Sequence, residues 1–232
     1  MAALSDPRHA AFLQMIDELH ARHLVGIEGV QEVWLIRHAD AYTGMETLSD
    51  GRVDPPLSSR GRDQARRLAA RLSAIPLDGV WASDLKRSQE TAEEIVRGRV
   101  LPVTVDPRLR EVRTYWDEGR QEKLDEPGVY PFPEPETEVV GRMTAALADV
   151  MAELVQSPRS PARAAEVSHN AAIGIYVSSL LGLSWGQLRV MPQFTSVTVL
   201  AVKDEQIVVR SIADATHLTE EEPEMREPDA TG

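Results

Sequence analysis

The stretch VWLIRHADAY, residues 33 to 42, decides the fold, because four apolar residues lead directly into an arginine and a histidine. A run as short and as apolar as Val33 to Ile36 is typical of a strand that is buried on both faces of a sheet. Arg37 and His38 then stand where that strand leaves the core. Ligands of open α/β sheets bind at the carboxyl ends of the strands, so the stretch predicts a candidate site as well as a strand.

Helical and strand patterns alternate along the rest of the chain. Apolar residues at helical spacing and short apolar runs follow one another at residues 65 to 72, 80 to 82, 85 to 96, 139 to 154, 164 to 168 and 171 to 181. Residues 195 to 202 and 206 to 211 predict a closing hairpin. The proline-rich residues 111 to 137 interrupt the alternation and predict a long loop, which is a candidate lid. The pattern is that of a layered α/β fold.

One domain accounts for most of the chain. Its 232 residues, 42% of them hydrophobic, are enough to bury one core, and we expect the domain to span residues 31 to 218. Residues 1 to 30 are predicted to form a helical extension, with a helix at residues 6 to 24. The apolar stripe of that helix packs either on the domain or on a second copy, as in a homodimer. Residues 219 to 232 hold six acidic residues and one arginine, and they predict a disordered tail.

The composition excludes several classes of function. The chain has no cysteine, so disulfides, thiolate metal sites and cysteine nucleophiles are ruled out. The formal net charge of −12 disfavours a nucleic-acid partner, because affinity for a phosphate backbone comes mostly from clustered lysine and arginine. No apolar run could span a bilayer, and the start of the chain lacks the pattern of a secretory signal. We therefore expect a cytoplasmic protein without a membrane partner.

Four segments place unusual polar residues where the predicted strands end. They are IRHAD at residues 36 to 40, ASDLKRSQETA at 82 to 92, RLREV at 108 to 112 and EVSHNA at 166 to 171. A single histidine is most often structural. Two strand-end histidines, His38 and His169, together with Arg37 and Arg87 at equivalent exits, instead favour one shared cleft.

These segments resemble the motifs of the histidine phosphatase superfamily, the phosphoglycerate mutase-like phosphatases, over roughly residues 32 to 218. The similar motifs are the Arg-His opening at Arg37 to Ala39, the LSSRGRDQA segment at Leu57 to Ala65, the second-arginine segment at Ser83 to Ala92, the acid motif at Leu109 to Glu111, the second-histidine motif at Ser168 to Asn170 and the DATHL signature at Asp214 to Leu218. The resemblance implies a three-layer α/β/α sandwich with a mainly parallel central sheet.

The resemblance also implies a reaction, namely phosphatase chemistry through a phosphohistidine, without cofactor or metal. His38 is the implied nucleophile, Arg37, Arg87 and His169 bind the phosphoryl group, and Glu111 is the acid and base. These residue types suit the chemistry, because a phosphoryl group in transfer spreads negative charge over three oxygens that fixed cationic donors stabilise. A neutral imidazole can attack phosphorus, and a carboxyl group can protonate the leaving oxygen.

Further candidates surround these five residues. Ser58 and Asn170 are candidates for orienting the reactive groups. Arg110, Arg113 and Tyr115 are candidates for binding the rest of the substrate, which we expect to be a small phosphorylated metabolite.

Two departures from the family pattern matter. Ala39 replaces the usual glycine after the nucleophile, which is the mildest substitution available there. The tyrosine-glycine and basic pair with which mutases grip phosphoglycerate is replaced by EVRTYWDEG at residues 111 to 119. The second departure favours a phosphatase over a mutase.

Four alternatives remain open on the sequence. They are a phosphoglycerate mutase, a phosphohistidine-protein phosphatase, a non-catalytic binding module on the same fold, and a metal site that would join His9, His20 or His23 to carboxylates. Retention of all five polar groups disfavours the binding module. The N-terminal histidines are more simply solvated residues of a helix.

Overall fold

A six-stranded sheet forms the centre of the computed structural model, which describes residues 7–41, 54–115, 117–120, 132–187 and 190–218. The strand order is β3-β2-β4-β1-β5-β6. The strands are β1 (Gln31–Arg37), β2 (Gly79–Ala82), β3 (Val103–Val105), β4 (Ala162–Ser168), β5 (Val197–Lys203) and β6 (Gln206–Asp214). Strands β3, β2, β4 and β1 run parallel, whereas β5 and β6 are antiparallel to their neighbours. The predicted mainly parallel sheet is confirmed.

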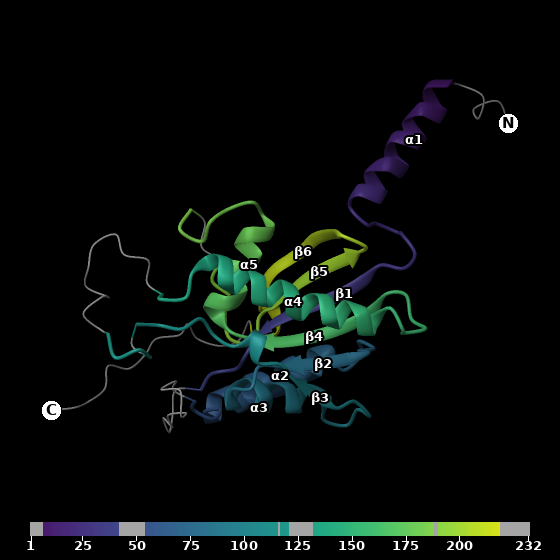
Figure 1. The fold of residues 1–232 in the computed structure, drawn as a ribbon. Helices are drawn as coiled ribbons and strands as arrows, with labels where there is room; N and C mark the ends of the chain where they lie inside the picture. The colour runs from purple at the N-terminus through teal and green to yellow at the C-terminus, as the bar shows by residue number, and fades with distance from the viewer. Residues whose placement is uncertain (1–6, 42–53, 116, 121–131, 188–189, 219–232) are drawn as a thin grey trace.

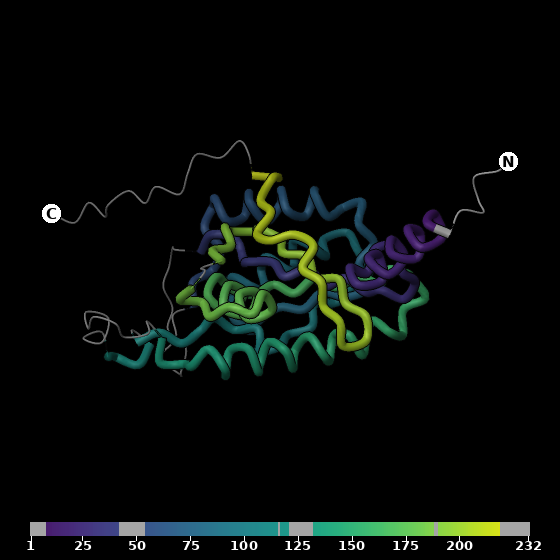
Figure 2. Tube along the Cα trace, turned by 90° about the horizontal axis from the view of Figure 1, so that it is seen from above, coloured from purple at the N-terminus to yellow at the C-terminus, as the bar shows by residue number. Residues whose placement is uncertain are grey.

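Helices cover both faces of this sheet (Figures 1 and 2). The helices are α1 (Pro7–Arg22), α2 (Ser59–Leu72), α3 (Lys86–Val96), α4 (Glu136–Leu154) and α5 (Asn170–Leu180), with short 3-10 helices at Pro107–Leu109 and Thr216–Leu218. Neighbouring residues of β1 face opposite layers, since Leu35 packs in the apolar cluster with α4 and α5 and Ile36 in the cluster with α2 and α3. The three-layer α/β/α sandwich is thus confirmed.

The strand order gathers the polar strand ends at one edge of the sheet. In the parallel pairing of β1 with β4, Arg37 lies opposite Ser168, and in that of β2 with β4, Ala82 lies opposite Val167. The residues that follow each strand therefore emerge side by side. His38 follows β1 and His169 follows β4, so the fold itself brings the two histidines together.

Helix α1 projects away from the sandwich, at the top right of Figure 1. Its apolar side chains Phe12, Met15 and Leu19 are about half exposed, at 54%, 52% and 48%. The sequence leaves open whether this stripe packs on the domain or on a second copy. In the described structure it does not pack on the domain. Among the described residues, no helix has both the length and the apolar character needed to cross a bilayer.

Parts of two predicted segments lie outside the described residues. These are the acidic tail at 219 to 232 and, within the candidate lid, residues 116 and 121 to 131. The last two residues of the predicted loop already belong to α4, which begins at Glu136.

Glu166 is a buried acid in the middle of β4. It lies opposite Leu35 of β1 and Trp81 of β2 and has no exposed surface. Neither of its carboxyl oxygens has a hydrogen-bond partner within the described part of the chain. Burial, reinforced by the negative charge of Asp106, raises the pKa of Glu166 to about 8. The neutral acid is therefore the form that the core accepts.

The contribution of Glu166 to the stability of the folded protein is expected to fall as the pH rises from about 5 to about 8. Below the unfolded-state pKa, Glu166 is neutral in both states; above it, the unfolded chain releases the proton while the folded chain retains it up to about pH 8. Glu166→Gln should remove at least about 2 kcal/mol of this pH dependence. Urea unfolding of both proteins at several pH values measures it. Parallel pH profiles of the two proteins would contradict the assignment.

Candidate active site

His38 stands directly after β1 with its proton position fixed. Its backbone N–H donates to the Ser168 carbonyl at 3.0 Å, and its ring Nδ1 lies 2.7 Å from the Ala39 carbonyl oxygen. A carbonyl oxygen can only accept, so Nδ1 carries the proton and Nε2 keeps a lone pair. The guanidinium Nε of Arg87 donates to that Nε2 at 3.2 Å. The lone pair of His38 is therefore on Nε2 and points at the Arg87 guanidinium.

The charge state of His38 follows from its surroundings. Its side chain is buried, and burial together with the cations of Arg87 and Arg37 holds the pKa of His38 well below the ordinary imidazole value. Phe194 adds an aromatic wall, with its ring centroid 5.7 Å from that of His38. At neutral pH the ring is therefore neutral and able to attack an electrophile.

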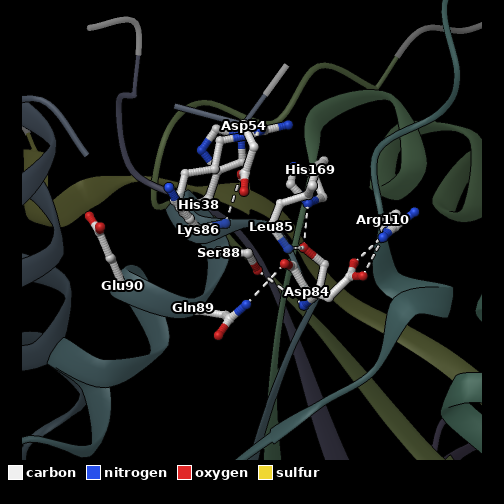
Figure 3. A network of polar contacts seen from close by, with 12 residues as sticks. His38, Asp54, Asp84, Leu85, Lys86, Ser88, Gln89, Glu90, Arg110 and His169 are labelled. Carbon is white, nitrogen blue, oxygen red and sulfur yellow. Dashed lines mark hydrogen bonds and ion pairs between the residues drawn. The ribbon is translucent and has the colours of Figure 1, made fainter. Parts of the chain in front are cut away.

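His169 caps the N-terminus of α5 and faces His38. The two ring centroids are 4.9 Å apart, and His169 has no exposed surface. Its Nε2 lies 2.7 Å from the Ser83 hydroxyl, whereas its Nδ1 has no partner among the residues that the structure describes. Burial and then the charge of Arg87, with smaller contributions from other neighbours, hold the pKa of His169 well below the ordinary value. Figure 3 shows the two histidines and the contact to the loop after β2.

Two arginines complete the cluster. Arg37, at the end of β1, donates from Nη1 to the Pro192 carbonyl at 2.8 Å, and its guanidinium carbon lies 3.8 Å from the centroid of the Phe194 ring. Arg87 comes from the first turn of α3, and its Nη1 lies 3.9 Å from Asp54. Two fixed cations beside two neutral histidines form a buried site suited to a phosphate group.

Glu111 lies against the N-terminus of α5. Its Oε1 accepts from the N–H groups of Val112 at 2.9 Å and Ala172 at 3.1 Å, and its Oε2 accepts from that of Ala171 at 3.3 Å. The helix whose N-cap is His169 therefore also holds the carboxylate. Of these three contacts, the one to Oε2 is the longest.

Ser58 orients the segment that follows His38. It is the N-cap of α2, accepts from the Gly61 N–H at 2.9 Å and donates to Asp40 Oδ2 at 2.7 Å. A Cβ atom on Gly61 would lie 1.9 Å from the Asp40 carbonyl oxygen, so only glycine lets α2 approach this closely. Asn170 is the first residue of α5, and its Oδ1 is buried without a partner in the described part of the chain.

The three residues proposed to bind the rest of the substrate lie on the loop after β3. Arg110 is half-buried and forms a two-point ion pair with Asp84, drawn in Figure 3. The side chain of Arg113 is 54% exposed and lies 3.8 Å from Glu118, while the guanidinium of Arg120 lies 5.4 Å from the ring centroid of Tyr115.

Helix α4 anchors this loop. Arg142 donates from Nη1 to the carbonyls of Arg108 and Arg110 at 2.6 and 2.7 Å, and from Nε to Glu134 at 2.6 Å. It therefore holds the segment that leads to Glu111.

Sequence reasoning missed three residues that shape the site. Ser83 contacts His169, Asp54 accepts from the N–H of Lys86 at 2.8 Å at the start of α3, and Phe194 stacks on Arg37. Ser83 follows β2 directly, so the strand-exit signal that selects His38 could have found it. Asp54 and Phe194 lie in segments without such a signal.

The described residues gather no group of three or more histidine, aspartate or glutamate side chains that could hold a metal ion. His9, His20 and His23 therefore belong to no such group. Metal independence itself stays a prediction.

Comparisons with known proteins agree on one family. The family model of the histidine phosphatase superfamily, branch 1, matches residues 33 to 215. A protein of Escherichia fergusonii named probable phosphoglycerate mutase GpmB is 30% identical over 208 residues, which cover 81% of this chain and 94% of that protein. A protein of the same name from Salmonella choleraesuis matches to the same extent.

Solved structures share the fold. Bacillus stearothermophilus YhfR superposes with a TM-score of 0.66 at 24% identity, over 81% of this chain and 99% of its own. A mycobacterial glucosyl-3-phosphoglycerate phosphatase, solved with VO3, has a TM-score of 0.62 at 25% identity, over 78% of this chain and 96% of its own. With the family match over most of its length, the chain is a phosphoglycerate mutase-like enzyme that belongs to the histidine phosphatase superfamily, branch 1.

Proposed function

We propose that this enzyme is a metal-independent phosphomonoesterase that acts through a phosphohistidine on a small phosphorylated metabolite. The observation that carries the proposal is the state of His38, which is buried, neutral and protonated at Nδ1, with its Nε2 lone pair beside the guanidinium of Arg87. A neutral nucleophile next to fixed cations is what attack on an anionic phosphate requires.

In the first step, Nε2 of His38 attacks phosphorus in line with the leaving oxygen. As the substrate enters, the Arg87 guanidinium stops donating to Nε2 of His38 and donates to a phosphoryl oxygen instead. Arg37 and His169 donate to the other phosphoryl oxygens. The bond between phosphorus and Nε2 forms as the bond to the leaving oxygen breaks. That oxygen takes a proton from the carboxyl group of Glu111, so a neutral alcohol departs.

In the second step, water attacks the phosphohistidine. Glu111, now a carboxylate, takes a proton from the water as the new phosphorus–oxygen bond forms and the bond to Nε2 breaks. Inorganic phosphate leaves, the lone pair returns to His38, and Glu111 has recovered its proton. The site needs no other proton donor or acceptor for a complete cycle.

A phosphoglycerate mutase is the second candidate, because the curated relatives carry that name. A mutase would return the phosphoryl group from His38 to another hydroxyl of the substrate rather than to water. The glucosyl-3-phosphoglycerate phosphatase among the similar structures supports the hydrolytic alternative. Both candidates take a small phosphorylated metabolite.

A panel of phosphorylated metabolites, assayed without added metal, tests the proposal. We expect phosphate release from at least one of them, unchanged by EDTA and inhibited by vanadate, which mimics the trigonal phosphoryl group. A mutase assay with and without 2,3-bisphosphoglycerate runs beside it. Activity that EDTA removes and a divalent ion restores would contradict metal independence, and isomerisation faster than phosphate release would favour the mutase.

The remaining expectations concern the whole protein. The exposed apolar stripe of α1 at Phe12, Met15 and Leu19 is compatible with pairing of two copies, because a lone helix of this length is marginal in water. The homodimer and the cytoplasmic location stay predictions.

A further inference from the structure

Ser83 connects β2 to the second histidine of the site. It follows β2 directly, has no exposed surface, and its N–H donates to the Val167 carbonyl at 3.1 Å. Its hydroxyl oxygen lies 2.7 Å from His169 Nε2, and the Leu85 N–H donates to the same oxygen at 3.4 Å. The Ser83 hydroxyl can thus donate its proton to His169 Nε2 while its oxygen accepts from the Leu85 N–H.

These two contacts determine where the ring proton of His169 and the hydroxyl proton of Ser83 lie. If Nε2 of His169 carried a proton, it would donate to Ser83, and the hydroxyl proton would be buried without an acceptor among the described residues. If Nε2 carries the lone pair instead, the hydroxyl donates to it while its oxygen accepts from Leu85. Every group of Ser83 is then satisfied. The neutral ring of His169 must therefore hold its proton on Nδ1.

Nδ1 of His169 is the atom left for a ligand. It is buried, it has no partner among the described residues, and its ring lies 4.9 Å from that of the nucleophile His38. A buried N–H without an acceptor is costly, so an incoming oxygen anion would relieve that cost. With the opposite tautomer, a lone pair would face the same anion and repel it.

We propose that Ser83 is a positioning residue, which fixes the tautomer of His169 so that Nδ1–H donates to a phosphoryl oxygen. This inference rests on the proposed phosphatase function for the identity of the anion, but the tautomer itself does not depend on activity. No proton is transferred in this role, because His169 stays neutral and only donates a hydrogen bond. Its contribution should be greatest in the transition state, where charge on the phosphoryl oxygens is redistributed.

Nitrogen NMR of isotope-labelled histidine tests the tautomer without substrate. The protonated and unprotonated nitrogens of an imidazole resonate far apart, and the signals of His169 can be assigned by their loss in His169→Gln. We expect the wild-type protein to show His169 protonated at Nδ1 and the Ser83→Ala protein to shift toward protonation at Nε2. A wild-type ring protonated at Nε2 would overturn the proposal, whether or not any variant folds.

Kinetics test the consequence, with Ser88→Ala as the matched control. Ser88 is equally buried and lies five residues away; its hydroxyl donates to the Val167 carbonyl and accepts from the N–H of Ser83 at 3.2 Å, but it contacts no histidine within the described part of the chain. Its removal therefore tests the backbone support of Ser83, which keeps its own hydroxyl and its N–H bond to the Val167 carbonyl. We expect Ser83→Ala to lower kcat at least about tenfold with a smaller change in KM. Ser88→Ala should keep both the tautomer and kcat, and Ser83→Thr, which retains the hydroxyl, should restore both.

The two readouts separate this inference from the proposed function. If the wild type hydrolyses no phosphomonoester, the proposed function fails, and titration with inorganic phosphate still tests whether the Nδ1–H signal responds to an anion. If the enzyme is active but Ser83→Ala matches Ser88→Ala in kcat, the positioning role is wrong. A loss of kcat without a change of tautomer would equally overturn it, because the effect would then be structural.

Discussion

Replacing His38 by alanine is expected to lower the turnover of phosphomonoesters below about one part in a thousand of the wild-type rate. The reason is chemical, because the described site contains a second histidine but only His38 has its lone pair beside an arginine donor. His169 directs its Nε2 to Ser83 and cannot take over the attack without turning its ring. Losing the covalent step removes several kcal/mol of transition-state stabilisation, which binding by the arginines does not replace.

The measurement pairs a phosphatase assay with a test of folding. His38→Ala should melt close to the wild type and should form no acid-labile phosphoryl adduct when given an aryl phosphate. His9→Ala, which changes an exposed histidine of α1, is the matched control and should keep full activity. Turnover of His38→Ala above the stated limit, with the fold intact, would mean that another residue is the nucleophile.

The fold could be predicted where residue patterns are strong. The apolar run at Val33 to Ile36 predicts β1, and the helical spacing of residues 139 to 154 predicts most of α4. Strand β3 (Val103–Val105) was missed, because three residues at a sheet edge, two of them exposed, carry almost no periodic signal. The partner of α1 could not be derived either, since an amphipathic stripe indicates burial without naming the surface that buries it.

The site could be predicted because parallel strands end at one edge of the sheet. That rule places His38, His169 and the strand exit before Arg87 together, as the pairing of β1, β4 and β2 does. What the sequence could not provide is the proton on each ring. The tautomer of His169 depends on the Ser83 hydroxyl, which is 86 residues away in the sequence. The sequence likewise could not show that the Glu111 carboxylate accepts from an N–H group of α5, 60 residues further on. Such contacts follow from the packed structure and leave no local pattern.

Glu111→Gln is expected to slow the hydrolysis of alkyl phosphates by about 10²-fold or more, and that of aryl phosphates far less in the phosphorylation step. An alkoxide is a poor leaving group and needs the proton of Glu111, whereas p-nitrophenolate departs largely unaided. Glutamine keeps an oxygen that can accept from Val112 and Ala172, so α5 and its N-cap His169 should stay in place. The comparison of leaving groups controls for any remaining disturbance, because a displaced His169 would slow both substrates equally.

The same variant should accumulate phosphorylated His38 when given the aryl substrate, because the carboxylate that deprotonates the attacking water is missing. The adduct is acid-labile and base-stable and can be detected as added mass on the intact protein. Glu118→Gln is the matched control, since Glu118 lies on the same loop, 3.8 Å from Arg113, and should leave both substrates unaffected. Equal slowing of aryl and alkyl phosphates by Glu111→Gln, with no trapped intermediate, would mean that the substitution disturbs the site as a whole and that the acid lies elsewhere. The Glu118→Gln variant would then report whether Glu118 is that acid, and Asp40, which lies two residues after His38 and accepts from Ser58, would be the residue to replace next.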